Sequence, residues 1–248
     1  MKGFTVVNTK SLTIKHRIVL ALAGHPKSGK SHFALTAPGP IAYLDLDAVE
    51  PMVLAKFMKG KQIFHADHSR PVLDIDPSHD DHIKRWKEFR STHETAVKDP
   101  KIRTIIWDTA TEVWEMCRLK HFGALSKKSH HYGPPNAEML SLIRMVKEQS
   151  DKNFIMLQQM TEIYENDMGT GRYGPAGFKQ VPYQANVIAT AYHDVDEMVE
   201  DDDASGFWIE LGKGSLDMGK CGEVLEPPMN DFANLASLMH GVKPSNWK

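Results

Sequence analysis

Long hydrophobic runs and a set of paired cysteines are both missing from this chain of 248 residues. Its longest apolar run, residues 18–23, is far shorter than the ~20 residues that a membrane-spanning helix needs. Residues 1–10 hold no apolar segment of the kind that a secretory signal requires. Two cysteines, Cys117 and Cys221, are too few for a disulfide framework. We therefore expect a cytoplasmic protein with no membrane partner.

A dominant charge of one sign is also absent. The chain carries 30 Lys and Arg against 32 Asp and Glu, for a formal net charge of −2. A nucleic-acid partner would consequently have to use local basic patches. With 41% hydrophobic and 25% charged residues, the composition excludes wholesale disorder and collagen-like or coiled-coil classes. No repeat or linker divides the chain, so we expect one domain with an N-terminal extension (1–16), a core (17–226) and a C-terminal helix and tail (227–248).

Short apolar runs alternate with helical patterns, which indicates an α/β fold with a mostly parallel sheet. Near-continuous apolar character is typical of strands that are covered on both faces. Strands are predicted at residues 17–23, 41–45, 102–108, 153–158, 187–192 and 207–211. Helices are predicted at residues 30–36, 80–97, 111–122, 137–149 and 231–239. The last two strands face each other across an acidic turn, which predicts an antiparallel hairpin near the C-terminus.

The clearest motif is GHPKSGKS at residues 24–31, which matches G-x-x-x-x-G-K-[ST] at every defined position. Such a loop wraps a polyphosphate with backbone N–H groups, and Gly24 and Gly29 leave room for it. We expect Lys30 to reach the β- and γ-phosphates of ATP and Ser31 to place its hydroxyl on Mg²⁺. The alternative is a glycine-rich turn that binds nothing. The predicted ATP site also includes His25, Pro26, Lys27, Ser28 and His32.

Polar residues end three of the predicted strands. Asp108 ends TIIWD, where an acid would hold Mg²⁺ through water; the alternative is an acid that only caps the next helix. Asp47 follows the strand at 41–45 and is the candidate to orient and deprotonate an attacking water, with Asp45 in reserve. A glutamine of the pair Gln158 and Gln159 could bond the γ-phosphate and sense its loss. A solvated loop acid and a surface amide are the respective alternatives.

In this order the motifs resemble the core of RecA-type recombinase ATPases, and among them the compact phage-encoded RecA-like annealing and recombination ATPases. GHPKSGKS is similar to the family's Walker A motif, TIIWDTA to its Walker B motif, and AYLDLDAVEPM to the strand with its catalytic acid. NFIMLQQ is similar to the strand that ends in the family's switch glutamine, here Gln159. WIELGKGSL resembles the strand whose lysine, here Lys213, contacts ATP on a neighbouring subunit.

The resemblance covers roughly residues 17–226 and implies a three-layer RecA-like core that hydrolyses ATP with Mg²⁺. It also implies a homo-oligomer, as a ring or filament, with ATP between subunits. Two positions depart from the pattern: Asp47 stands where Glu is usual, and Val53 where many relatives place an adenine-stacking aromatic residue. The shorter acid keeps open a nucleotide-gated loader or interaction protein with little turnover. A nucleotide kinase is a weaker alternative, because its lid needs several arginines and Arg172 stands alone.

The resemblance further implies single-stranded DNA as the partner, with a single-strand-binding protein as a further candidate. Two segments, 126–135 and 162–177, would face the DNA, and we expect both to be loops that DNA orders. Cations beside aromatic rings suit single strands, because phosphates take the charge and bases stack on the rings. A solvated connector is the alternative for either segment. The candidate DNA contacts are Lys127, Lys128, Tyr132, Arg172, Tyr173 and Lys179.

Overall fold

The computed structural model describes residues 16–69, 78–123, 131–165, 168–193, 206–213 and 216–247. Its strands are β1 (Val19–Gly24), β2 (Ile41–Asp45), β3 (Ile63–Asp67), β4 (Thr104–Asp108), β5 (Asn153–Glu165), β6 (Met168–Pro175), β7 (Val187–His193), β8 (Phe207–Leu211) and β9 (Val224–Leu225). Its helices are α1 (Lys30–Leu35), α2 (Pro51–Met58), α3 (His79–Lys98), α4 (Ala110–Phe122), α5 (Gly133–Gln149), α6 (Val181–Gln184) and α7 (Phe232–His240). Two 3-10 turns, η2 (Met218–Lys220) and η3 (Pro244–Trp247), complete the described elements.

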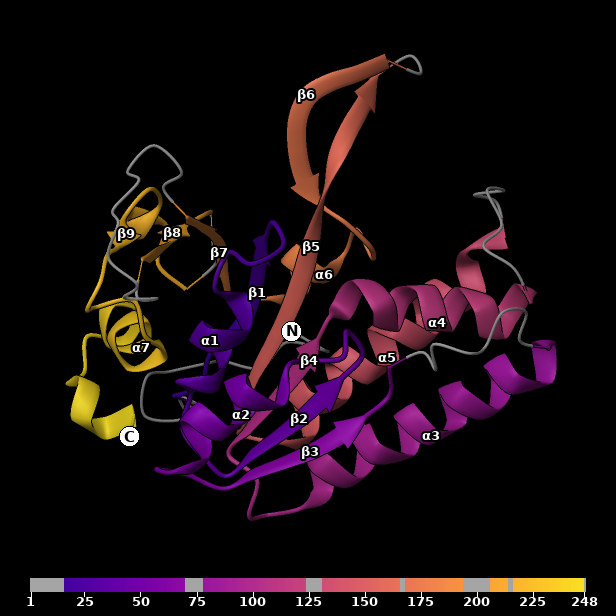
Figure 1. Cartoon of the computed structure of the whole chain (residues 1–248), viewed down its shortest axis with the longest axis horizontal. Coiled ribbons are helices and arrows are strands. Elements are labelled where there is room, and N and C mark those ends of the chain that lie inside the picture. The colour runs from indigo at the N-terminus through magenta and orange to yellow at the C-terminus, as the bar shows by residue number, and fades with distance from the viewer. Residues whose placement is uncertain are drawn as a thin grey trace, which may run out of the picture.

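One nine-stranded sheet forms the middle of three layers (Figure 1). Its order is β3-β2-β4-β5-β1-β7-β8-β9, and β6 pairs only with β5. The strands from β3 to β7 in this order run parallel, whereas β8 and β9 continue the sheet antiparallel. The α/β class, the mostly parallel sheet and the C-terminal antiparallel hairpin predicted from the sequence are therefore confirmed.

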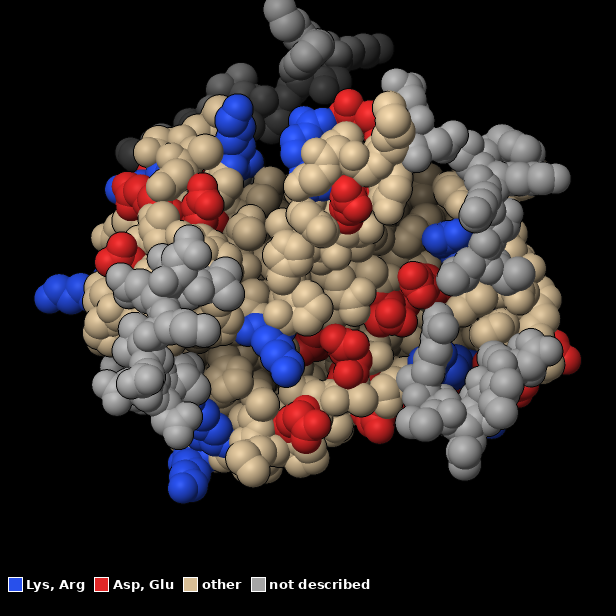
Figure 2. Space-filling view, turned by 45° about the horizontal axis from the view of Figure 1, so that its top comes forward, with Lys and Arg blue, Asp and Glu red and all other residues tan. Residues whose placement is uncertain are grey.

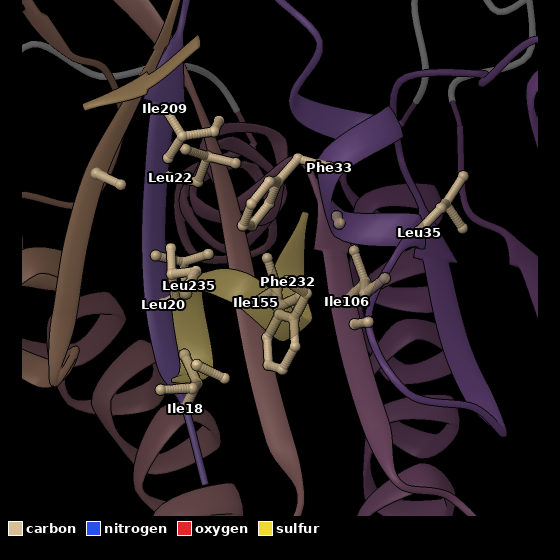
Figure 3. Close-up of a cluster of buried hydrophobic side chains, with 14 of the residues drawn as sticks. Ile18, Leu20, Leu22, Phe33, Leu35, Ile106, Ile155, Ile209, Phe232 and Leu235 are labelled. Carbon is tan, nitrogen blue, oxygen red and sulfur yellow. The ribbon is translucent and has the colours of Figure 1, made fainter. Parts of the chain in front are cut away.

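Alternating side chains on the central strands divide the hydrophobic core in two. Leu20 and Leu22 of β1 point to one face, where α1 and α7 cover them with residues such as Phe232 (Figure 3). Val19 and Ala21 point to the other face, where α3, α4 and α5 pack. Burying one large apolar side chain stabilises a fold by ~1.5–3 kcal/mol, so two such faces hold the central strands firmly. The carboxyl ends of these strands thereby become a rigid edge.

Two predictions about segments near this edge are wrong. The segment 162–177 is largely a hairpin, not a loop, because β5 continues to Glu165 and pairs antiparallel with β6. The hairpin rises out of the body of the molecule (Figure 1). The other segment, 126–135, ends inside a helix, because α5 begins at Gly133 and carries prolines in its first turn, where a missing N–H costs nothing.

None of the helices within the described residues is both long enough and apolar enough to span a membrane.

Candidate nucleotide-binding site

A cavity of about 440 Å³ lies at the carboxyl ends of β1, β2 and β4. This volume is within the range of small-molecule sites, and the place is where open α/β sheets bind ligands. A larger cavity of about 530 Å³ is lined by Arg103, Lys152 and Trp247 at the amino ends of β4 and β5, so it belongs to the opposite edge. The first cavity is lined by Pro26, Lys27, Ser28, Gly29, Lys30, Ser31, His32, Asp47, Val49, Glu50, Val53, Asp108, His193 and Phe207.

The two glycines of the β1–α1 loop are required by the packing of the loop itself. A Cβ on Gly24 would stand 2.6 Å from the carbonyl oxygen of Ala191 in β7. Gly29 has a φ of +83°, and a Cβ there would stand 2.3 Å from the ring of Phe207. Residues that carry a side chain rarely adopt such a φ, so only glycine fits this turn against β8 without strain. The room at these two glycines therefore serves the packing of the loop as well as the phosphates expected from the motif.

Lys30, the first residue of α1, lies back across the loop. Its Nζ donates hydrogen bonds to the carbonyl oxygens of Gly24 and His25, at 2.9 and 2.7 Å. Partial burial lowers its pKa, and the carboxylates of Asp108 and Asp47 oppose that shift. The ammonium group is thus held between the loop and the acids of the neighbouring strands. Its contact with phosphate stays a prediction.

Ser31 and Asp108 are in direct contact across the sheet edge. The Ser31 hydroxyl donates to Oδ2 of Asp108 at 2.6 Å, and the Tyr43 hydroxyl of β2 donates to the same oxygen. Asp108 does not cap α4, because Thr109 takes that position and its Oγ1 accepts from the backbone N–H of Glu112 at 3.3 Å. The alternative of an acid that serves only as a helix cap is therefore wrong.

The acids of this edge favour a cation. Burial raises the pKa of Asp108, hydrogen bonds from Ser31 and Tyr43 oppose the rise, and the carboxylates of Asp47 and Asp45 add to it. Burial and neighbouring negative charges destabilise a carboxylate. A divalent cation that binds beside it stabilises the charged form. A hydroxyl and a carboxylate oxygen 2.6 Å apart are the hard ligands that suit Mg²⁺. Ser31 and Asp108 could therefore hold that ion, and their role as its ligands stays a prediction.

Asp45 and Asp47 occupy different environments. Asp45 is buried and accepts hydrogen bonds from the backbone N–H groups of Asp47 and Val49 and from Nε2 of His65, at 2.9–3.2 Å. It therefore shapes the turn after β2. Asp47 is exposed on the rim of the cavity, where partial burial and Asp45 raise its pKa while Lys30 and Gln159 lower it. Of the two acids, Asp47 is the one that could meet a water molecule.

Gln158 and Gln159 point in opposite directions, as neighbours on a strand do. The buried amide of Gln158 donates to the carbonyl oxygen of Ala176 at 2.9 Å, and the backbone oxygen of Gln159 accepts from the N–H of Ala176 at 2.8 Å. The side chain of Gln159 lies near Asp47 and lowers the pKa of that carboxyl. The two residues thus join the end of the β5–β6 hairpin to the rim of the cavity. The sensing role of Gln159 stays a prediction.

The β5–β6 hairpin touches the nucleotide-binding loop. The rings of Tyr173 and His25 meet edge to face, with centroids 4.8 Å apart. Tyr173 is half exposed, and Tyr164 and Met168 on the same hairpin are more exposed. Arg172 forms an ion pair with Glu165, both of them exposed, and such pairs are weak.

The other candidate DNA residues are scattered. Lys127 and Lys128 lie outside the described residues. Tyr132 packs against Trp114 and under the guanidinium of Arg118, at 5.9 and 5.4 Å, so its ring is only partly available.

Lys179 is exposed beyond β6, and Lys213 is exposed two residues past the end of β8. The N–H of Gly212, next to Lys213, donates to the carbonyl oxygen of Ile188 near the amino end of β7. The cavity lies at the opposite, carboxyl end of the strands, so Lys213 is not among the residues that line it. A contact of Lys213 with a neighbouring subunit's nucleotide stays a prediction. Figure 2 shows acidic and basic side chains mixed over the described part of one face, without a continuous field of either sign.

Tyr43 and Phe207 are site residues that the sequence argument missed. Tyr43 lies two residues before Asp45, and strand alternation alone would have placed it on the same face as that acid. Phe207 and His193 reach the cavity from β8 and β7. No local signal marks them, since they become neighbours of the loop only when β7 pairs with β1.

A family match identifies the class to which this chain belongs. A comparison with curated proteins found no match. Solved structures that match include that of a RadB recombinase, with a TM-score of 0.49 and 12% sequence identity over 84% of each chain. A family model described as an AAA domain matches residues 16–215, which is most of the chain and includes the whole nucleotide-binding loop. The chain therefore belongs to the AAA domain family of P-loop ATPases.

Proposed function

We propose that this chain is a RecA-like, Mg²⁺-dependent ATPase that binds single-stranded DNA and promotes annealing or strand exchange, as a cytoplasmic homo-oligomer in recombination of the phage type. The observation that carries the ATPase part is the 2.6 Å contact of Ser31 with Asp108, next to Lys30, in a cavity of small-molecule size. The DNA part is supported by the hairpin that presents exposed tyrosines next to the same loop. The order of motifs along the chain supports the recombination context.

Each side chain at the cavity has a defined part in this proposal. The loop amides and Lys30 bind the phosphates, and Ser31 and Asp108 hold Mg²⁺, which neutralises phosphate charge when bound. Asp47 accepts the proton of the attacking water, and its raised pKa brings it nearer to that of an effective base. Gln159, beside Asp47, orients the same water. A trans cation such as Lys213 would complete the site, so the isolated chain should turn over slowly.

The test is ATP hydrolysis by the full chain with and without single-stranded DNA. We expect DNA to stimulate hydrolysis, and Lys30→Ala to abolish nucleotide binding while leaving the thermal midpoint of the free protein nearly unchanged. Lys87→Ala, at an exposed lysine of α3 that does not line the cavity, is the matched control and should keep most activity. An unstimulated rate together with no salt-sensitive DNA binding would reject the recombination proposal. Phosphate transfer to a nucleotide instead of water would indicate a kinase.

A gated interaction protein with little turnover is the second candidate. The observation that favours it is the short side chain of Asp47 on the exposed rim of the cavity, one methylene shorter than the family's usual glutamate. Measuring oligomer size with ATP, ADP and no nucleotide separates the two. Assembly that depends on ATP without measurable hydrolysis would favour the loader, and Asp47→Glu would then be expected to raise the rate.

A further inference from the structure

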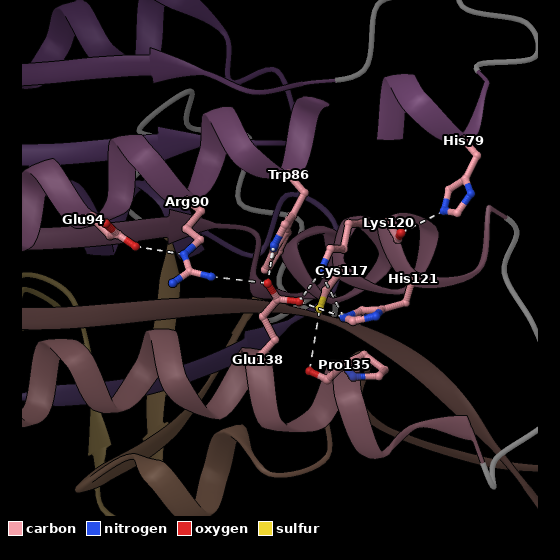
Figure 4. Close-up of polar contacts among 9 residues, drawn as sticks. All are labelled: His79, Trp86, Arg90, Glu94, Cys117, Lys120, His121, Pro135 and Glu138. Carbon is pink, nitrogen blue, oxygen red and sulfur yellow. Dashed lines mark hydrogen bonds and ion pairs between the residues drawn. The ribbon is translucent and has the colours of Figure 1, made fainter. Parts of the chain in front are cut away.

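A second polar cluster lies away from the nucleotide cavity, between α4 and α5 (Figure 4). Cys117 and His121 stand one turn apart on α4, and Glu138 faces them from α5. One ligand atom of each, the thiol sulfur, a ring nitrogen and a carboxylate oxygen, lie within 4.8 Å of one another. This is the one such trio of metal-ligand side chains found in the described parts of the chain. Cysteine and histidine at i and i+4 on a helix present both donors on one face.

The cluster already attracts a cation. The ammonium of Lys120 lies 2.8 Å from Oε2 of Glu138 and 3.4 Å from Nε2 of His121. The indole N–H of Trp86 donates to the other oxygen of Glu138 at 2.8 Å. Glu138 is therefore fixed in place with one carboxylate oxygen directed at the space between the two helices.

The three donor residues differ in how deeply they are buried. Cys117 is fully buried, whereas the side chains of His121 and Glu138 are 20% and 15% exposed. An ion can therefore reach the histidine and the carboxylate first, and the thiol behind them last. A metal site needs such an entry path as well as its ligands.

We propose that Sγ of Cys117, Nε2 of His121 and Oε2 of Glu138 bind one Zn²⁺ ion, which displaces the ammonium of Lys120. Thiolate, imidazole and carboxylate at ~2.0–2.3 Å are the usual ligands of this ion, with water in a fourth position. Tetrahedral coordination at these bond lengths places the donors roughly 3.3–3.7 Å apart. The 2.7 Å pair of His121 and Glu138 would therefore open, while the wider separations, which are no more than 4.8 Å, would close. The sulfur forms its bond to zinc as the thiol proton leaves to solvent.

The site would hold together two helices that the candidate DNA segment connects. α4 follows Asp108 and ends at Phe122, and α5 begins at Gly133. The ion would cross-link their facing turns independently of the nucleotide. Zinc binding at this site and the proposed ATPase activity can therefore be tested independently.

The test uses the full chain and Co²⁺ as a spectroscopic probe for zinc. We expect one equivalent of Co²⁺ to give a near-ultraviolet thiolate-to-cobalt band and tetrahedral visible bands, both removed by added Zn²⁺. Cys117→Ser should lose the thiolate band and bind Zn²⁺ at least ~100-fold more weakly, because loss of even an outer-shell partner costs ~10–100-fold. Cys221→Ser, which changes the exposed second cysteine, is the matched control and should keep the full spectrum.

A second variant tests the displacement of the lysine. Lys120→Met keeps the length of the side chain but removes the competing charge, so Zn²⁺ affinity should rise about tenfold. A cobalt spectrum without a thiolate band in the unsubstituted protein would overturn the proposal. So would a band that survives Cys117→Ser, an affinity that Lys120→Met lowers, or binding that needs millimolar metal.

Discussion

At the scale of single residues, Asp45 and Asp47 show how position decides what a carboxylate can do. Asp45 is buried, and its oxygens are already bonded to the turn that follows β2 and to His65. Asp47 stays on the exposed rim, where partial burial and Asp45 raise its pKa and Lys30 and Gln159 lower it. The first acid therefore contributes to folding, and the second is available for chemistry.

Replacing Asp47 should remove turnover but not nucleotide binding. Asp47→Asn cannot accept a proton, so we expect the hydrolysis rate to fall by ~10²–10⁴. ATP affinity should change only a few-fold, because Lys30 and Ser31 are untouched. Single-turnover hydrolysis and a fluorescent-nucleotide titration check both parts.

Asp45→Asn is the matched comparison for that experiment. It should lower the thermal midpoint, because a buried carboxylate that accepts several hydrogen bonds loses its charge. If Asp45→Asn stopped hydrolysis in a stable protein while Asp47→Asn did not, the assignment of the two acids would have to be exchanged.

His93 is a buried histidine whose tautomer the structure defines. The indole N–H of Trp107 donates to its Nδ1 at 3.2 Å, so Nε2 carries the ring hydrogen and donates to the carbonyl oxygen of Leu142 at 3.1 Å. Complete burial lowers the pKa of His93 from 6.5 to about 4. The folded protein thus holds the neutral ring, and a proton cannot be added without breaking the bond from Trp107.

Stability should consequently fall in mild acid. The unfolded chain binds a proton at the ordinary pKa of ~6.5, so the contribution of His93 is complete above that pH and is lost as the pH falls toward 4. Between pH 7.5 and 5 the free energy of unfolding should drop by about 2 kcal/mol on this account. Urea unfolding at the two pH values measures the drop.

The His93→Gln variant should be less stable at pH 7.5 but lose most of the pH dependence. His79→Gln, at an exposed histidine, should keep it in full. An equal pH dependence in all three proteins would show that other groups cause it.

At the scale of elements, the buried strands could be predicted from the sequence, whereas the exposed β5–β6 hairpin could not. β2 and β8 have the predicted bounds because apolar runs between turn residues mark covered strands. β6 is exposed along most of its length and contains three glycines, so neither alternation nor composition marks it as a strand. β3 lies at the edge of the sheet and is mostly not buried, so its composition does not mark it as a strand and the sequence did not predict it.

The candidate site likewise contains residues that could be predicted from the sequence and residues that could not. Ser31 and Asp108 were expected to lie close together because parallel strands end at one edge of the sheet, and they do. Phe207 comes from a strand far along the chain, and Glu138 meets Cys117 only through the packing of α4 on α5. Contacts made by tertiary packing leave no local pattern that a sequence argument could use.

The hairpin supplies a prediction for DNA binding. Base stacking on one aromatic ring is worth ~1–3 kcal/mol, so Tyr173→Ala should weaken binding of single-stranded DNA about 5- to 150-fold. Fluorescence anisotropy with a labelled oligonucleotide measures the change. Tyr183→Ala removes a tyrosine that is 84% exposed on α6, outside the hairpin, and should leave affinity unchanged. Equal losses in both variants would argue against stacking on the hairpin.

At the scale of the whole molecule, the charge is balanced, with a net charge of −2 and mixed signs on the described part of the face in Figure 2. Nucleic-acid affinity that depends on a broad positive field is therefore not expected. Binding would use a small number of cations, and the candidates are Lys127, Lys128, Arg172 and Lys179.

Salt dependence should reflect that small number. Each phosphate neutralised on a single strand contributes about −0.7 to the slope of log affinity against log salt, so four cations give about −3 per subunit. Anisotropy titrations over a range of KCl concentrations measure the slope. A slope much steeper than this would show that further basic residues meet the DNA.

Strand β5 runs from Asn153 in the buried core to Glu165 in the exposed hairpin, and its pairing with β6 is irregular between Glu162 and Tyr164. Gln159 lies before that irregularity, with its side chain near the acid at the cavity and its backbone oxygen bonded to Ala176, which follows β6. A strand can bend where its ladder is irregular. The outer part of the hairpin can therefore swing about this point while Gln159 keeps its place beside the cavity.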